Sequence, residues 1–190
     1  MKIEVLWDQL LEHGLEHLIL EQDVDIEVNS LAIGTIDGAA YRIKYQIVCD
    51  AGWKVKRVRV ENLLNKQEIV LIKNENNKWA DETNKIIKGL DDCTDVDIMI
   101  TPFTNTLPIQ RMKLDLNESK EIPVIYISIP DLSVSGLKQR YTYVSREKDD
   151  GIYKYENLNS GFTSVIKVDG DGLVTDYPDI FKLVWKKSDP

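Results

Sequence analysis

The feature that most constrains this chain is the period of two in its apolar residues. Along 41–47, large apolar side chains alternate with polar ones, which is the pattern of a strand with one buried face. The alternation recurs at 24–28, 96–100, 125–129, 162–168 and 181–185. A chain built mainly from such half-buried segments must cover one face of a sheet, and antiparallel sheets do so most readily. We therefore predict an all-β, mainly antiparallel fold.

Turn residues separate the predicted strands, and two segments show helical spacing. Asp37 and Gly38 form the dipeptide typical of a tight hairpin turn. Further turn signals occur at 50–52, 74–77, 149–151 and 169–172. The apolar spacing of 3–11 favours a helix that ends at Gly14. A second helix is predicted at 104–114, where Thr106 caps the first turn and Pro108 is tolerated within it.

Length and charge limit the classes of protein. With 190 residues and no linker or repeat, residues 1–190 are expected to form one domain. The net charge of −8 disfavours nucleic acid and anionic membrane surfaces as partners. No apolar run approaches ~20 residues, so no membrane span is predicted. Acidic residues interrupt the first apolar runs, which argues against a signal peptide and favours a cytoplasmic protein. The sequence leaves the oligomeric state open.

Motifs for catalysis and cofactors are weak. The segment His13–His17 matches the H-x-x-E-H pattern of inverted zinc peptidases, but Gly14 disfavours the helix that this chemistry needs. Two surface histidines near the start of a strand are the preferred interpretation. Cys49 and Cys93 lack metal spacing, and no nucleotide-binding loop is present, so no cofactor or metal is expected. The segment 169–172 favours a turn over a calcium loop because the EF-hand spacing is absent.

An acidic pair precedes a segment rich in threonine, asparagine and proline. Asp95 and Asp97 lie two residues apart, so both project from the same strand face. Short polar side chains in 101–111 fix irregular backbone, and Arg111 is placed to reach the carboxylates. Three interpretations stay open. The carboxylates form a solvated face, or the polar groups satisfy one another in a tight crossing, or they form the polar wall of a pocket.

Two other segments depart from simple alternation. After Trp53, neither strand face is cleanly apolar, so we predict either a bulge near Lys56 or an inward-pointing Arg57 or Arg59 that meets an anionic group. Later in the chain, polar and aromatic side chains share one face. They are Gln139, Tyr141, Tyr143, Tyr153 and Tyr155. Such a stripe suits the binding of sugars or amphiphiles, although cross-strand packing explains it as well.

The acidic pair and the segment that follows it carry a family resemblance. The segments 89–97 and 101–111 resemble the central motif of the putative glycolipid-binding family, a bacterial-type domain in which Asp-Val-Asp precedes a Thr-Pro-x-Thr-Asn-Thr-Leu-Pro-Ile-Arg-Arg run. Shorter matches span most of the chain. They include Trp7, 14–16, Tyr45, Asp50 with Trp53, 56–58, Gln139 with Tyr141, Tyr153 with Tyr155, Phe162, 168–169, 172–174 and 177–178. Gln110 departs from the arginine of the family motif.

The resemblance implies a spiral β-roll of many short strands wound around one short central helix. It also implies a non-catalytic protein that binds a glycolipid or another small amphiphile in an apolar cavity inside the roll. The residues expected to bind the ligand are Asp95, Asp97, Thr101, Asn105, Arg111, Arg57, Gln139 and Tyr141. No catalytic residues follow from the resemblance. The alternatives are a hydrolase that uses Asp95 and Asp97, and a purely structural or interaction domain.

Overall fold

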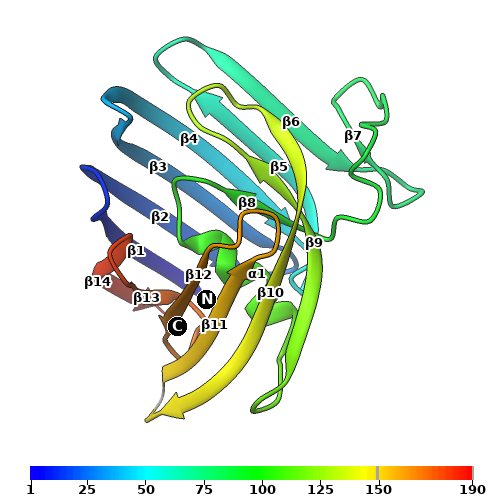
Figure 1. Cartoon of the computed structure of the whole chain (residues 1–190). Coiled ribbons are helices and arrows are strands. Elements are labelled where there is room, and N and C mark those ends of the chain that lie inside the picture. The colour runs from blue at the N-terminus through cyan, green and yellow to red at the C-terminus, as the bar shows by residue number, and fades with distance from the viewer. Residues whose placement is uncertain (149, 190) are drawn as a thin grey trace.

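A computed structural model describes residues 1–148 and 150–189 (Figure 1). The first half of the chain forms seven strands. They are β1 (Lys2–Gln9), β2 (Gly14–Gln22), β3 (Ile26–Ile36), β4 (Ala39–Cys49), β5 (Val55–Asn62), β6 (Gln67–Lys73) and β7 (Trp79–Ala80). The second half contains one 3₁₀ turn, one α-helix and seven more strands. They are β8 (Asp95–Ile98), η1 (Phe103–Asn105), α1 (Thr106–Met112), β9 (Ser119–Ile127), β10 (Val134–Glu147), β11 (Asp150–Asn157), β12 (Thr163–Val168), β13 (Val174–Tyr177) and β14 (Phe181–Asp189).

All fourteen strands belong to one sheet. Their order is β7-β6-β5-β4-β3-β2-β1-β14-β13-β12-β11-β10-β9-β8, so the first and last strands of the chain pair in the middle of the sheet. Neighbours are antiparallel except β8 and β9, which are parallel. The sheet curves around α1 without closing into a barrel (Figure 1). The predicted all-β, mainly antiparallel fold with a single short helix is confirmed.

The hairpin of β3 and β4 shows how alternation produces this sheet. Ile43, Tyr45 and Ile47 are fully buried on the concave face, which is the face toward α1, while the intervening polar residues are more exposed. The predicted turn joins the two strands, with positive φ angles at Asp37 and Gly38 as a type I′ turn requires. The turn predicted at 149–151 includes Asp149, which lies outside the described residues.

The predicted bulge near Lys56 is confirmed. Val48 pairs with Arg57 and Cys49 pairs with Val55, which leaves Lys56 as the extra residue in β5. The extra residue restores the alternation, so Val55 and the later valines of β5 all face the core. Arg57 and Arg59 therefore lie exposed on the convex face, and the alternative of an inward-pointing arginine is wrong.

The helix predicted at 3–11 is wrong, because this segment is β1. Ile3, Val5 and Trp7 are buried at a period of two, and this alternation outweighs the helical spacing that Leu10 and Leu11 suggested. The helix predicted at 104–114 is confirmed over Thr106–Met112. Its cap differs from the prediction, because Asn105 occupies the N-cap position and makes no capping bond with its side chain.

Two apolar clusters hold the fold together. The larger cluster joins β1–β5 to the segment 95–112, which runs from β8 through η1 to α1 and is called the crossing. Phe103 and Leu107 in this segment belong to the cluster and have no exposed surface. The second cluster joins the other end of α1 to β9–β14 and is rich in tyrosine. Burial of the helix between two halves of one sheet therefore fixes its position. No helix among the described residues has the length and apolar character that crossing a membrane demands.

Candidate functional site

Asp95 and Arg111 form a buried ion pair between β8 and α1. Arg111 Nε lies 3.1 Å from Asp95 Oδ1, and Arg111 Nη2 lies 2.5 Å from Asp95 Oδ2. Thr94 Oγ1 also donates to Asp95 Oδ2, at 2.7 Å. The Asp95 side chain is 1% exposed and that of Arg111 is 17% exposed, so the pair is shielded from water. This two-point contact ties the end of α1 to the edge strand, as the sequence predicted for Arg111.

Asp97 faces the same side of β8 but meets neutral donors. Gln139 Nε2 donates to Asp97 Oδ2 at 2.6 Å, and Thr104 Oγ1 donates to Asp97 Oδ1 at 3.2 Å. Gln139 Nε2 also donates to the Tyr155 hydroxyl at 3.0 Å. Burial raises the pKa of Asp97, and the bonds from Gln139 and Thr104 oppose that rise. With these contacts, the solvated-face interpretation of Asp95 and Asp97 is wrong.

The tyrosines of β10 and β11 pack across the strands and hold the crossing. Tyr141 lies opposite Tyr155 with ring centroids 5.4 Å apart, and Tyr143 stacks on Tyr153 at 4.8 Å. Tyr141 also donates its hydroxyl to Asn105 Oδ1 at 2.8 Å. The stripe that the sequence revealed therefore packs across the strands, and the Tyr141 hydroxyl bonds to the segment before α1.

Thr101 connects the crossing to a buried acid that sequence reasoning missed. Thr101 Oγ1 accepts from the Phe103 amide at 3.0 Å and lies 3.0 Å from the Tyr45 hydroxyl. Tyr45 in turn donates to Glu16 Oε1 at 2.5 Å, and Ser30 donates to the same oxygen at 2.7 Å. A usable signal was present, because alternation in β2 places Glu16 on the same face as buried leucines.

Glu16 is a carboxyl group with an incomplete set of partners. It is 2% exposed, and its Oε2 atom has no hydrogen-bond partner among the described residues. Burial raises the pKa of Glu16 to about 7, while the bonds from Tyr45, Ser30 and Thr101 lower it in part. Glu16 therefore gains or loses its proton near neutral pH, inside the core rather than at the surface.

The remaining sequence candidates lie apart from the crossing. Arg57 sits on the convex face and meets Glu82 at 3.5 Å, so it does not join the other predicted ligand-binding residues. His17 contacts Glu4 at 2.8 Å, and β2 rather than a helix carries it. Among the residues that the structure describes, no three histidine, cysteine or acidic side chains gather as a metal site would need. The interpretation of two surface histidines near the start of a strand is confirmed, because His13 is exposed in the turn before β2 and His17 is partly exposed within β2.

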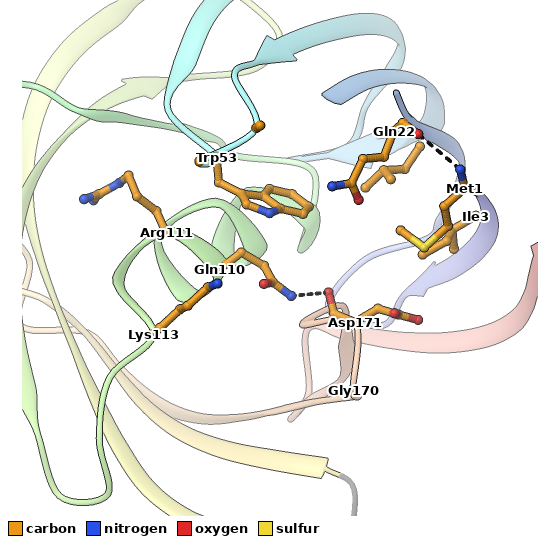
Figure 2. A pocket seen from close by; sticks show the side chains of 12 residues that line it. Met1, Ile3, Gln22, Trp53, Gln110, Arg111, Lys113, Gly170 and Asp171 are labelled. Carbon is orange, nitrogen blue, oxygen red and sulfur yellow. Dashed lines mark hydrogen bonds between the residues drawn. The ribbon is translucent and has the colours of Figure 1, made fainter. Parts of the chain in front are cut away.

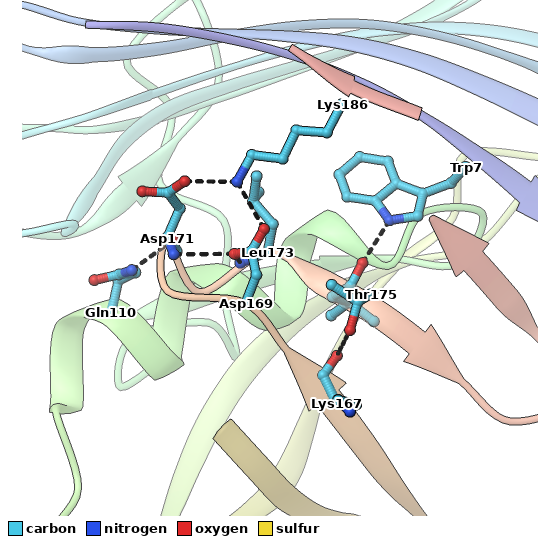
Figure 3. Close-up of polar contacts among 9 residues, drawn as sticks. Trp7, Gln110, Lys167, Asp169, Asp171, Leu173, Thr175 and Lys186 are labelled. Atoms are coloured by element: carbon cyan, nitrogen blue, oxygen red, sulfur yellow. Dashed lines mark hydrogen bonds and ion pairs between the residues drawn. The ribbon is translucent and has the colours of Figure 1, made fainter. Parts of the chain in front are cut away.

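The segment 169–172 forms a turn, as predicted, and is held by an ammonium group (Figure 3). Lys186 Nζ lies 2.7 Å from Asp169 Oδ2 and 2.5 Å from Asp171 Oδ2. Gln110 Nε2 donates to the Asp171 carbonyl at 2.6 Å, which joins the turn to α1. Nearby, Trp7 Nε1 donates to the Val174 carbonyl at 2.6 Å. These bonds fix the turn against both the helix and the central strands.

An open cleft of about 530 Å³ lies beyond the C-terminal end of α1 (Figure 2). We call it the α1 cleft. Its walls come from the start of β1, the end of β2, the β4–β5 turn, the end of α1 and the turn at 169–172. The lining residues are Met1, Ile3, Leu20, Gln22, Ala51, Gly52, Trp53, Gln110, Arg111, Lys113, Gly170 and Asp171. The volume falls within the range of small-molecule sites.

Trp53 is held over this cleft in an unusual backbone conformation. Its φ angle is 64°, a region that bulky side chains rarely adopt. Asp50 holds the turn by accepting the Trp53 amide on its carbonyl and the Gly52 and Lys54 amides on its side chain. Figure 2 shows the indole above Gln110, with Gln22 and Met1 across the opening. The turn therefore fixes an aromatic surface beside amide groups.

The structure separates the predicted residues from this cleft. Arg111 is the one predicted binding residue that lines it, and Figure 2 shows its guanidinium pointing away. Asp97, Gln139, Tyr141 and Asn105 are linked to one another by hydrogen bonds. Asp95 bonds to Arg111, Thr101 contacts Tyr45, and Arg57 lies on the convex face. Sequence reasoning missed Trp53, Gln22 and Asp171 as cleft residues, although an aromatic residue directly after Asp50-Ala51-Gly52 was a visible signal. Gln110, which departs from the family motif, is a cleft residue and bonds to the turn at 169–172.

Comparison with known proteins agrees with the motif around β8 and α1. The profile of the family described as "Putative glycolipid-binding" matches residues 4–182. The crystal structure of a DUF1089 family protein from Pseudomonas aeruginosa is 31% identical, with 88% of this chain and 91% of that chain covered and a TM-score of 0.76. A comparison with curated proteins finds no match. This chain belongs to the putative glycolipid-binding family.

Proposed function

We propose that the α1 cleft binds the sugar headgroup of a glycolipid or a similar amphiphile without catalysing a reaction. The observation that supports this proposal most is Trp53, an aromatic side chain held over the cleft by a strained turn. Unfavourable backbone conformations of this kind cost about 1–3 kcal/mol and concentrate at functional sites. An indole face packs well against the apolar face of a sugar ring, and neighbouring amides bond to its hydroxyl groups.

The lining of the cleft is divided in a way that suits an amphiphile. Gln22, Gln110 and Asp171 bring amide and carboxylate groups to the opening. Met1, which is 49% exposed, gives the opening an apolar side chain on the β1–β2 side, next to the nearly buried Ile3 and Leu20. A ligand with a polar ring and the beginning of an alkyl chain fits this division. The apolar cavity expected inside the roll stays a prediction, and the α1 cleft is an open alternative to it.

The contacts of the crossing favour binding over hydrolysis. Asp95 is fully engaged by Arg111 and Thr94, and Asp97 is bonded to Gln139 and Thr104. A general acid or base needs an open path to its substrate. We therefore assign Asp95, Asp97, Thr101, Asn105, Gln139 and Tyr141 the role of holding α1 in place, and through it the floor of the cleft. Their direct contact with a ligand stays a prediction.

The proposal is tested with n-octyl glucoside below its micellar concentration. Calorimetric titration is compared among the native chain, Trp53→Phe and Trp53→Ala. Because aromatic contacts contribute about 0.5–1.5 kcal/mol, we expect Trp53→Ala to weaken binding by up to about tenfold and Trp53→Phe to retain most of it. Trp185→Ala is the matched control, because this tryptophan is 43% exposed and does not line the cleft.

Two further probes separate the sugar from the chain. Methyl glucoside should bind weakly at the same place, and octanol should bind less tightly than octyl glucoside. Equal affinity of the native chain and Trp53→Ala for octyl glucoside would contradict the proposed site. Native mass spectrometry of the protein purified from cells supplies an independent measurement, with a co-purified lipid as the expected result.

A further inference from the structure

The edge strand β6 is paired along only part of its outer side. On its inner side, β6 pairs with β5 from Arg57–Ile72 to Asn62–Gln67. On its outer side, β7 pairs only with Ile72 and Lys73. Within the described part of the chain, the segment 67–71 therefore has no strand neighbour on that side, as the upper edge in Figure 1 shows. Exposed edges of this kind accept a further strand from another chain.

An apolar groove of about 410 Å³ runs along this open segment. We call it the β6 groove. Its apolar wall is built from Ile69, Val70, Leu71, Ile87 and Val134. Ile87 comes from the segment after β7 and Val134 begins β10, so the groove is bounded by separate parts of the chain. A backbone edge beside an apolar groove is the arrangement that binds extended peptides, because the edge bonds to the backbone and the groove takes alternate side chains.

The charges of the β6 groove restrict the partner. Glu68, Asp81 and Glu82 line it, and none of its lining residues is basic. Arg57 and Arg59 contact Glu82 and Glu68 from the convex face. The Thr83 hydroxyl and the Lys85 amide lower the pKa of Asp81, which keeps this group a carboxylate. Because the two arginines already pair with Glu82 and Glu68, the rim keeps a small excess of negative charge at Asp81, and this excess favours a cationic segment.

We propose that the β6 groove binds an extended segment of a partner protein in which apolar residues alternate with lysine or arginine. The segment adds to β6 as a fifteenth strand, with apolar side chains in the groove and basic side chains at the acidic rim. A second copy of this chain fits less well. A two-fold pairing of β6 with itself would bring the same three carboxylates together from both sides.

The test uses a set of eight-residue peptides in which lysine alternates with valine, isoleucine or threonine. Each has a counterpart with glutamate in place of lysine, and binding is measured by fluorescence anisotropy. We expect the lysine peptides to bind at least tenfold more tightly than their counterparts, with the difference shrinking in added salt. If no lysine peptide binds more tightly than its counterpart, the proposal is overturned.

Reversing the charge of two acidic residues that line the β6 groove tests whether the lysine peptides bind there. Exposed ion pairs contribute about 0.2–1 kcal/mol each, so we expect the double change Glu68→Lys and Glu82→Lys to weaken lysine-peptide binding about threefold to tenfold. Glu75→Lys is the matched control, because Glu75 is exposed in the β6–β7 turn and does not line the groove. Equal weakening by the control variant would overturn the assignment to the groove.

Hydrogen exchange identifies the strand addition itself. Outward-facing amides of 67–71 should exchange rapidly in the free chain and become protected when a lysine peptide binds. Protection that instead rises with protein concentration in the absence of peptide would show that a second copy occupies the edge, which contradicts the proposal.

Discussion

Two polar regions border α1, and they differ in how their groups are used. Beneath the helix, Asp95, Asp97 and Asn105 accept hydrogen bonds at 2.5–3.2 Å from side chains of α1, η1 and β10. Beyond its C-terminal end, the side chains of Gln22 and Trp53 face an open space of about 530 Å³. The first region resembles the interior of a domain, where polar groups must be paired. The second resembles a binding site, where side chains keep bonding capacity for a ligand.

The comparison shows that the most distinctive sequence motif and the α1 cleft are different places in the fold. The hydrogen bonds and the ion pair of the motif residues fix the position of α1. Because α1 is fixed, Gln110 and the end of the helix lie at the cleft. The comparison predicts that substitutions beneath the helix mainly change stability, while substitutions at the cleft mainly change binding.

The largest effect is expected from Asp95→Ala. The substitution leaves the Arg111 guanidinium, whose side chain is 17% exposed, without its buried carboxylate partner, and breaking such a pair lowers the free energy of unfolding by up to about 3–5 kcal/mol. Urea unfolding followed by circular dichroism measures the change. The control is Asp91→Ala, which removes an ion pair with Lys78 whose side chains are both 46% exposed, and it should cost under about 1 kcal/mol. Similar losses in the two variants would break the proposed distinction.

Glu16 should make stability depend on pH. Its pKa is raised from 4.5 to about 7 in the fold, so the folded chain binds this proton more tightly than the unfolded chain. The stabilisation is fully present below pH 4.5 and is lost as the pH rises to about 7, by roughly 3 kcal/mol in total.

Urea unfolding of the native chain and Glu16→Gln from pH 4.5 to 8 measures this contribution. The glutamine variant lacks the titrating group, so the difference between the two proteins should change across this range and level off above it. A constant difference would show that Glu16 titrates at its ordinary pKa.

A smaller loss is expected from Tyr141→Phe. The variant keeps the ring packing but leaves Asn105 Oδ1 without the Tyr141 donor, and an unsatisfied buried acceptor costs about 1–3 kcal/mol. Unfolding in urea again provides the measurement. Tyr143→Phe is the matched control, because Tyr143 is partly exposed and stacks on Tyr153 through its ring. If octyl glucoside binding falls with Tyr141→Phe while stability is unchanged, the hydroxyl contacts ligand rather than the helix support.

The smallest change in stability is expected from Trp53→Gly. Glycine adopts the positive φ angle of this position without strain, which offsets the packing that the indole loses. We expect the free energy of unfolding to change by only about 1 kcal/mol, while octyl glucoside binding falls as in Trp53→Ala. A loss of several kcal/mol would place Trp53 with the structural region instead of the cleft.

The fold was more predictable from sequence than the site. Strand alternation is a local pattern in the sequence, so the β3–β4 hairpin and the bulge at Lys56 could be predicted from it. The failure at 3–11 shows the limit of this signal, because Leu10 and Leu11 mimic helical spacing where a strand ends in a turn. The Asp95–Arg111 contact could be predicted because the two residues lie at the two ends of one short segment. Glu16 was missed although the alternation in β2 places it on the face of the buried leucines, because a glutamate in such a pattern is usually exposed.

The all-β class, the helix near 104–114 and the family membership could be predicted from the sequence alone, since each rests on patterns that are local in the chain. Only the tertiary structure decided that β1 and β14 meet in mid-sheet, that Arg57 lies outside, and that Trp53 and Gln110 face one cleft. These relations join segments that are far apart in sequence. Sheet curvature and helix burial place them together, and no local pattern encodes either one.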